Sequence, residues 1–92
     1  MSLSKIGNAK WHVYIVRCID DTLYTGVTVD INARIEKHNL GKGARYTRSR
    51  VPVTLVYSEA VQTRSAAQER EYAIKQLSRI EKLELVDSIF ID

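Results

Sequence analysis

The sequence has a single cysteine, Cys18, and no long apolar run. One cysteine excludes an internal disulfide framework and a zinc site built from cysteines, and it is typical of a protein in a reducing cytoplasm. The apolar runs are too short to span a membrane. The N-terminal ten residues contain no hydrophobic segment of the kind found in secretion signals. We therefore expect a cytoplasmic protein without a membrane partner.

Repeats, low-complexity tracts and linkers are also absent from the sequence. The 92 residues are 45% hydrophobic and 27% charged, a composition typical of an ordered globular chain. A chain of this length can bury one modest hydrophobic core. We therefore expect a single domain over residues 1–92, with its core in residues 11–83.

The net charge of +3 is small but unevenly distributed. Residues 34–50 contain six basic side chains and one acidic one, so this segment carries +5 and the remainder −2. A basic loop that also contains glycines and an aromatic residue is suited to docking a phosphate backbone, although an ordinary solvated loop has the same composition. The candidate nucleic-acid-binding residues are Lys42, Arg45, Tyr46, Arg48 and Arg50.

Three segments rich in β-branched and aromatic residues predict strands. The predicted strands cover residues 12–19, 22–27 and 53–57. Only Asp20 and Asp21 separate the first two, so we expect them to form a hairpin.

Capping signals predict three helices, which cover residues 31–40, 65–77 and 79–86. Asp30 is a good N-cap for the first helix and Gly41 ends it. Ser65 and Gln68 have the spacing of a capping box at the start of the second. The order ββαβαα predicts an α+β fold, a small three-stranded antiparallel sheet with helices packed on it.

The first predicted helix places a histidine on its apolar stripe. Ile31, Ile35 and His38 share one face at helical spacing, and Arg34 lies one turn before His38. A histidine in such a stripe is more often part of the core than catalytic. The neighbouring guanidinium favours a functional role, because a partly buried arginine needs an anion.

The second predicted helix carries Glu71 at the edge of its apolar stripe. A carboxylate there is usually solvated or paired with a cation, but it is also suited to hold one Mg²⁺ ion, which needs only one or two carboxylates. Arg70 falls near the centre of the stripe. Either its side chain reaches out to solvent or the helix is rotated from the predicted orientation.

The predicted hairpin contains Tyr14 and Tyr24, whose relative orientation depends on the turn. A three-residue turn places both rings on one face of the sheet, and a two-residue turn places them on opposite faces. Tyrosines in strands are ordinarily packing residues. Spacing alone leaves a small nuclease and a small binding module equally open.

Two triplets in the hairpin, HVY at residues 12–14 and YTG at residues 24–26, resemble the motifs of the GIY-YIG nuclease domain. The first triplet keeps only the tyrosine, and the second keeps the tyrosine and the glycine. The helical arginine of that family falls at Arg34, its histidine or tyrosine one turn later at His38, and its glutamate at Glu71.

The resemblance covers residues 11–83, which is most of the chain. The segment GKGARYTR, residues 41–48, is similar to a loop of the small single-domain bacterial branch of this family. Together with the strand and helix order, the matched residues favour the same fold.

The resemblance implies an endonuclease that hydrolyses phosphodiester bonds in branched, nicked or single-stranded DNA with one divalent cation, Mg²⁺ or Mn²⁺. Glu71 would hold the cation and Arg34 the scissile phosphate. One tyrosine, preferably Tyr14, would deprotonate the attacking water, and His38 would accept a proton or orient a tyrosine hydroxyl. The implied catalytic residues are Tyr14, Tyr24, Arg34, His38 and Glu71.

Two departures from the family pattern support an alternative. The lysine that many members carry after the second motif is missing from residues 27–29, and residues 76–86 lack the asparagine found near the end of many members. The alternative is a catalytically weak or inactive nucleic-acid-binding module with the same fold. A third hypothesis is a subunit that docks on a protein partner through Ile89, Phe90 and Ile91. The sequence does not distinguish DNA from RNA as the ligand.

Overall fold

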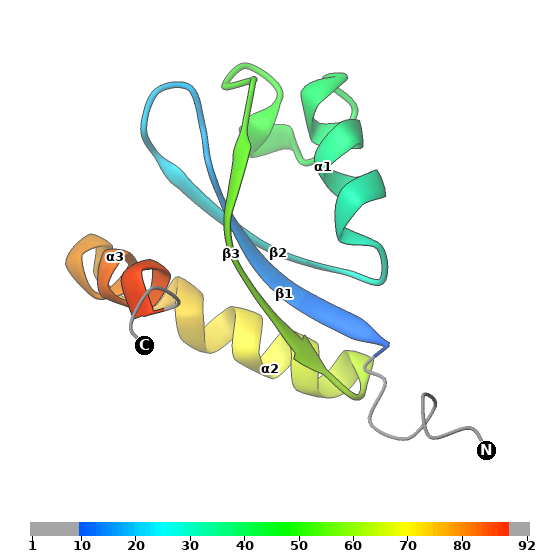
Figure 1. The fold of residues 1–92 in the computed structure, drawn as a ribbon, viewed down its shortest axis with the longest axis vertical. Coiled ribbons are helices and arrows are strands. Elements are labelled where there is room, and N and C mark those ends of the chain that lie inside the picture. Colours follow the sequence, from blue (N-terminus) through cyan, green and yellow to red (C-terminus); the bar gives the residue numbers. More distant parts are fainter. Residues whose placement is uncertain (1–9, 89–92) are drawn as a thin grey trace.

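Three antiparallel strands form the centre of the computed structural model, which describes residues 10–88 (Figure 1). They are β1 (Trp11–Arg17), β2 (Leu23–Thr28) and β3 (Thr54–Val61), arranged in the order β2-β1-β3. The central strand β1 contains four consecutive buried residues, because both its edges are paired and both its faces are covered. The predicted antiparallel sheet and α+β class are confirmed.

Two strand boundaries differ from the prediction by more than one residue. β1 ends at Arg17 rather than residue 19, because the amide of Cys18 donates to the carbonyl of Thr22 and closes the hairpin turn. β3 continues to Val61 rather than residue 57, because it pairs along the whole of β1, up to Trp11.

The helices are α1 (Ile31–Asn39), α2 (Arg64–Lys75) and α3 (Arg79–Asp87), and a 3₁₀ turn covers Arg45–Thr47. As predicted, the Asp30 side chain caps α1 by accepting from the amide of Ala33, and Gly41 follows with a φ of +78°. This positive φ explains why a glycine stands there.

The predicted capping box at Ser65 is wrong. Thr63 is the N-cap of α2, because its extended backbone lets its hydroxyl accept from the amide of Ala66. The reciprocal capping box lies at the start of α3, where Ser78 and Glu81 exchange side-chain to backbone bonds.

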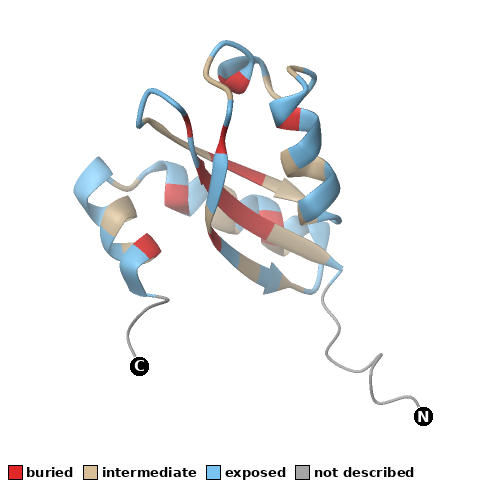
Figure 2. Cartoon of the chain, turned by 45° about the horizontal axis from the view of Figure 1, so that its top comes forward, coloured by how far each residue is buried: buried red, intermediate tan, exposed pale blue. Residues whose placement is uncertain are grey.

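Two apolar clusters lie on opposite faces of the sheet, with α2 and α3 on one side and α1 on the other (Figures 1 and 2). Alternate β1 side chains supply the two clusters. Val13 and Ile15 pack with residues of α2 and α3, whereas Tyr14 and Val16 pack with residues including Ile35 of α1. The face of Tyr14 is therefore the face on which α1 presents its side chains.

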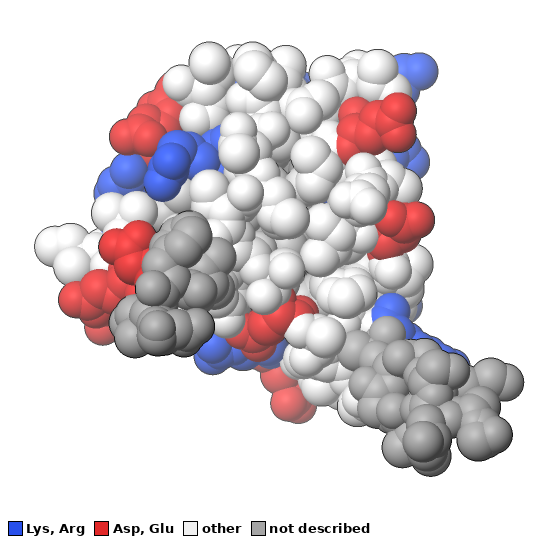
Figure 3. Space-filling model, in the orientation of Figure 1, with Lys and Arg blue, Asp and Glu red and all other residues white. Residues whose placement is uncertain are grey.

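Charged side chains gather along the margins of the face drawn in Figure 3. Basic and acidic groups are mixed there, around an uncharged centre. This face of the described residues therefore offers no broad basic surface to a polyanion.

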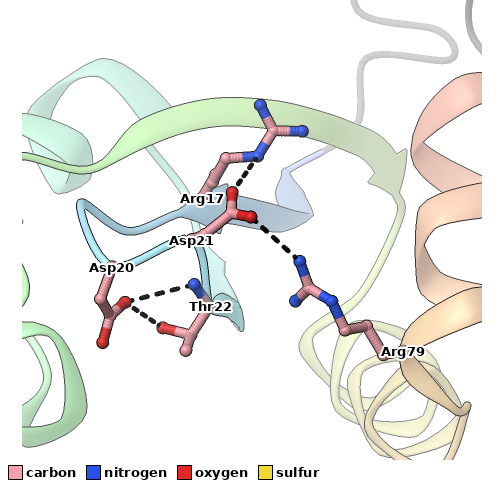
Figure 4. Close-up of polar contacts among 5 residues, drawn as sticks. All are labelled: Arg17, Asp20, Asp21, Thr22 and Arg79. Atoms are coloured by element: carbon pink, nitrogen blue, oxygen red, sulfur yellow. Dashed lines mark hydrogen bonds and ion pairs between the residues drawn. The ribbon is translucent and has the colours of Figure 1, made fainter.

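Ion pairs and hydrogen bonds hold the tip of the β1–β2 hairpin (Figure 4). Asp20 accepts from the amide and the hydroxyl of Thr22, at 3.2 Å and 2.6 Å. Asp21, with a φ of 71°, pairs with Arg17 and Arg79 at 3.5 Å each. The turn is thereby tied both to its own strand and to α3.

None of the helices within residues 10–88 has the length and apolar composition needed to cross a membrane. The third hypothesis rests on Ile89, Phe90 and Ile91, which lie outside the described residues.

Candidate functional site

Tyr14 and Tyr24 lie on the same face of the sheet. Tyr14 pairs with Gly26 and Val16 with Tyr24, so the paired residue numbers have an even sum. The cause is the turn, because the bond from Cys18 to Thr22 leaves three residues at the tip. Of the two alternatives that the sequence left open, the structure has the one that brings the tyrosines together.

A buried hydrogen bond links the first tyrosine to the helical histidine. The Tyr14 hydroxyl lies 2.8 Å from Nε2 of His38, and the two residues are 1% and 0% exposed. On the other side of the ring, Nδ1 lies 2.8 Å from the hydroxyl of Thr47. His38 is thus a core histidine with both ring nitrogens bonded, and one of its partners is a candidate catalytic residue.

Two glycines make room for these side chains. A Cβ at Gly26 would lie 2.5 Å from the Tyr14 hydroxyl oxygen and 2.7 Å from Cζ. A Cβ at Gly43 would collide with Nδ1 of His38 and lie 2.9 Å from its Cα. The glycine of the second triplet therefore lets the Tyr14 ring lie directly on β2, and Gly43 lets the following loop close over His38.

Gly26→Ala is expected to lower the free energy of unfolding by about 1–3 kcal/mol, because the new methyl group overlaps the Tyr14 ring. Urea denaturation measures this. Replacing glycine by alanine without a clash usually raises stability, so unchanged or increased stability would contradict the close packing of Tyr14 on Gly26.

Arg34, Tyr24 and Glu71 lie close enough to Tyr14 to influence the pKa of its hydroxyl. Burial raises the pKa of Tyr14 above its ordinary value. The Arg34 guanidinium beside the hydroxyl lowers this pKa, whereas Tyr24 and Glu71 raise it, and burial prevails. The Tyr24 ring also meets the His38 ring edge-on at 5.6 Å. All five candidate catalytic residues therefore lie within one neighbourhood.

The surroundings of His38 favour its neutral form. Burial, and to a smaller extent the positive charge of Arg34, lower the pKa of His38 below its ordinary value. A neutral imidazole has one nitrogen that can accept a proton.

Glu71 and Arg70 leave α2 on opposite sides of its buried stripe, which consists of Ala67 and Ile74. Arg70 pairs with Glu59 of β3 at 2.7 Å, which explains the arginine that disturbed the predicted stripe. Glu71 pairs with Lys75 at 3.1 Å, and its side chain is 22% exposed.

The Glu71 carboxylate fits one loosely held divalent cation. No group of three or more His, Cys, Asp or Glu side chains within residues 10–88 could hold a metal ion. A single carboxylate suits Mg²⁺, which keeps several waters and often completes its shell with substrate phosphate oxygens. Lys75, which pairs with one oxygen of this carboxylate, would compete with such an ion.

Some of the predicted nucleic-acid-binding residues in the basic loop pack against the hairpin, and the others are exposed to solvent. Arg50 lies 4.0 Å from the centre of the Tyr46 ring and pairs with Asp20 at 3.0 Å, and Tyr46 stacks on Tyr24. Tyr46 and Arg50 therefore hold the loop against the hairpin. Three basic residues of the loop are exposed and make no ion pair within the described part of the chain: Lys42, Arg45 and Arg48.

The sequence patterns did not single out Thr47, Lys75 or Lys82. The two lysines line a groove of about 230 Å³ with Tyr24 and Tyr46. These lysines belong to α2 and α3, far in sequence from the basic segment, so the charge pattern did not point to them. Thr47 was not predicted because a single threonine forms no recognisable sequence pattern. A larger groove of about 340 Å³ lies between β3 and α3 and contains no candidate catalytic residue.

Sequence comparison identifies bacterial relatives that match most of this chain. UPF0213 protein SH2523 of Staphylococcus haemolyticus is 53% identical over 79 residues, which cover 86% of this chain and 96% of that protein. UPF0213 protein DP2720 of Desulfotalea psychrophila is 62% identical over 77 residues, which cover 83% of this chain and 70% of that protein.

Two solved structures share the fold. The solution structure of the UPF0213 protein BH0048 from Bacillus halodurans has a TM-score of 0.55 and 47% identity, covering 84% of this chain and 82% of that one. That of protein EF2693 from E. faecalis has a TM-score of 0.58 and 31% identity, covering 92% and 91%. The sequence profile of the GIY-YIG catalytic domain matches residues 10–84. The chain therefore belongs to the GIY-YIG catalytic domain family, a family of nucleases.

Proposed function

We propose that this protein is a divalent-metal-dependent endonuclease that hydrolyses phosphodiester bonds in DNA and selects its substrate by structure rather than by sequence. One observation carries this proposal: the Tyr14 hydroxyl is hydrogen-bonded at 2.8 Å to Nε2 of the buried His38, whose pKa burial lowers. A hydroxyl hydrogen-bonded to an imidazole nitrogen can pass its own proton to that nitrogen while it takes one from water, which lets it act as a general base. Arg34 and Glu71 act on the same hydroxyl.

Tyr14 serves as the base through a proton relay. It takes a proton from the attacking water while its own proton passes to Nε2 of His38. The hydroxide oxygen bonds to phosphorus, the bond from phosphorus to the leaving oxygen breaks, and solvent protonates that oxygen. Because burial raises the pKa of Tyr14, a tyrosinate at neutral pH is disfavoured, and the relay avoids it.

Tyr24 is the alternative base. It is less buried than Tyr14, but its hydroxyl has no hydrogen-bond partner within residues 10–88 to which a proton could pass. Its ring meets the His38 ring edge-on and stacks on the Tyr46 ring. These contacts favour a packing role for Tyr24 and the basic role for Tyr14.

Arg34 and Glu71 complete the proposed site. Arg34 binds the scissile phosphate through its guanidinium, whose paired donors match phosphate oxygens. Glu71 would hold a Mg²⁺ or Mn²⁺ ion, which supplies charge stabilisation at the phosphate and the leaving oxygen. Phosphate contacts position a substrate without reading its bases, which is the reason for proposing structural selectivity.

The direct test is cleavage of branched, nicked and single-stranded DNA, and of RNA, with Mg²⁺ or Mn²⁺ and with a chelator as the control. We expect metal-dependent cleavage of DNA. Binding without cleavage on every substrate would contradict the proposal and support the non-catalytic module. The observation that favours this module is the contact between Lys75 and Glu71, since a lysine ammonium already neutralises the carboxylate.

The exposed part of the basic loop is expected to bind the phosphate backbone. The double variant Arg45→Ala/Arg48→Ala should weaken DNA binding and lower the slope of log K against log[salt] by roughly 0.7–0.9 for each phosphate that is no longer neutralised. Fluorescence anisotropy at several salt concentrations measures both quantities. The control Arg64→Ala/Arg79→Ala removes the same charge outside the loop. Equal effects in the two variants would contradict the assignment.

A further inference from the structure

A fully buried threonine closes a chain of hydrogen bonds behind the candidate base. Thr47 is 0% exposed, and its hydroxyl lies 2.8 Å from Nδ1 of His38. The same hydroxyl donates to the backbone carbonyl of Ala44 at 2.9 Å. The chain therefore runs from the Tyr14 hydroxyl through the imidazole and the threonine to a backbone carbonyl.

The last acceptor in this chain is a backbone carbonyl, and its chemistry fixes the direction of every hydrogen bond in the chain. A carbonyl oxygen only accepts, so the single hydroxyl proton of Thr47 points to Ala44. The Thr47 oxygen can then only accept from His38, so Nδ1 carries the imidazole proton. Because the imidazole is neutral, Nε2 is left without a proton and accepts from the Tyr14 hydroxyl.

We propose that Thr47 is a positioning residue that locks His38 in its Nδ1–H tautomer, so that Nε2 always faces Tyr14 as a proton acceptor. The catalytic consequence of this proposal rests on the proposed nuclease function, but the tautomer itself does not.

The opposite tautomer would disable the relay. With the proton on Nε2, His38 would donate to the Tyr14 oxygen, and the tyrosine could not pass its own proton to the ring. This is also the tautomer that histidine prefers in water. The Tyr24 ring and Arg34 also lie near His38, but among residues 10–88 the only hydrogen-bond partner of Nδ1 is the Thr47 hydroxyl.

The loop is built to bring Thr47 to the ring. Gly43 permits the close approach, since a Cβ there would collide with Nδ1. The 3₁₀ turn then directs Thr47 inward, and its amide also donates to Ala44. Arg50 pairs with Asp20, and Tyr46 stacks on Tyr24. These two contacts hold the 3₁₀ turn against the hairpin.

The test is side-chain ¹⁵N NMR of His38, which distinguishes a protonated from an unprotonated ring nitrogen without any substrate. The chain has two histidines, so a His12→Gln background leaves His38 as the sole signal. We expect a protonated Nδ1 and an unprotonated Nε2 in this background. In Thr47→Val, which keeps the shape but loses the hydroxyl, we expect the proton to move to Nε2. Thr47→Ser keeps the hydroxyl and should restore the original pattern.

Cleavage assays of the same variants test the catalytic consequence. Thr47→Val should lower kcat by about 10- to 100-fold with little change in KM, by analogy with other histidines that lose an orienting partner, and Thr47→Ser should recover most of the rate. A protonated Nε2 in the wild-type ring overturns the proposal even where Thr47→Val does not fold. An unchanged tautomer in folded Thr47→Val, or a full rate after the tautomer has changed, also overturns it. The expected tautomer shift in a protein that cleaves no nucleic acid supports the positioning role and contradicts the nuclease function alone.

Discussion

Tyr14→Phe is expected to lower the rate of DNA cleavage by about 100- to 10,000-fold, the range that removal of a general base produces. The variant keeps the ring that packs on Gly26 but loses the hydroxyl that bonds to His38. It also leaves Nε2 of a buried imidazole without a donor, which should cost about 1–3 kcal/mol of stability. Single-turnover cleavage measures the first effect and urea denaturation the second.

Tyr24→Phe is the matched control, because it removes a tyrosine hydroxyl from the same face of the hairpin. We expect a much smaller loss of rate, since this hydroxyl has no acceptor within residues 10–88. A greater loss in Tyr24→Phe than in Tyr14→Phe would exchange the roles of the two tyrosines and contradict the relay through His38.

Glu71→Gln is expected to lower the cleavage rate by about 100- to 1,000-fold and to abolish Mn²⁺ binding at this site. Glutamine preserves the size of the side chain but removes the charge on which a single-carboxylate cation site depends. The helix should stay folded, because a partly exposed ion pair within one helix, such as that of Glu71 with Lys75, contributes little to stability. Electron paramagnetic resonance of Mn²⁺ measures binding independently of cleavage.

Glu69→Gln provides the control on the same helix, since Glu69 is exposed and outside the site. It should leave both cleavage and Mn²⁺ binding unchanged. Equal Mn²⁺ binding in wild type and Glu71→Gln would place the cation elsewhere. Tighter Mn²⁺ binding in Lys75→Met would show that the lysine competes with the ion for Glu71.

Local signals predicted the elements well because their physical causes are local. Asp30 caps α1 through an amide three residues away, and Gly41 ends the helix by its own backbone conformation. Helical spacing likewise put Arg34 and His38 side by side on α1. The error at the start of α2 was also local, because two residues near its N-terminus, Thr63 and Ser65, carry side chains that favour a cap.

Long-range contacts lay beyond these signals. Helical spacing alone did not explain an arginine near the centre of the apolar stripe of α2. The explanation is an ion pair between Arg70 and Glu59, which belongs to strand β3. Tyr46 and Arg50 are predicted to contact a phosphate backbone, and the structure adds a second role for them, because Tyr46 stacks on Tyr24 and Arg50 pairs with Asp20. Composition alone does not separate these two uses of an aromatic or basic residue.

The sequence alone predicted the order of strands and helices, the antiparallel sheet and the residues that could form a site. It could do so because hydrophobic periodicity and helix capping depend on neighbours within a few positions. The three-dimensional packing settled the turn length that brings Tyr14 and Tyr24 to one face, and the bond between Tyr14 and His38, 24 residues apart. It also brought Thr47 against Nδ1 of His38 and so selected which nitrogen of the imidazole carries the proton. A tautomer is set by hydrogen-bond partners from distant segments, and only folding brings those partners together.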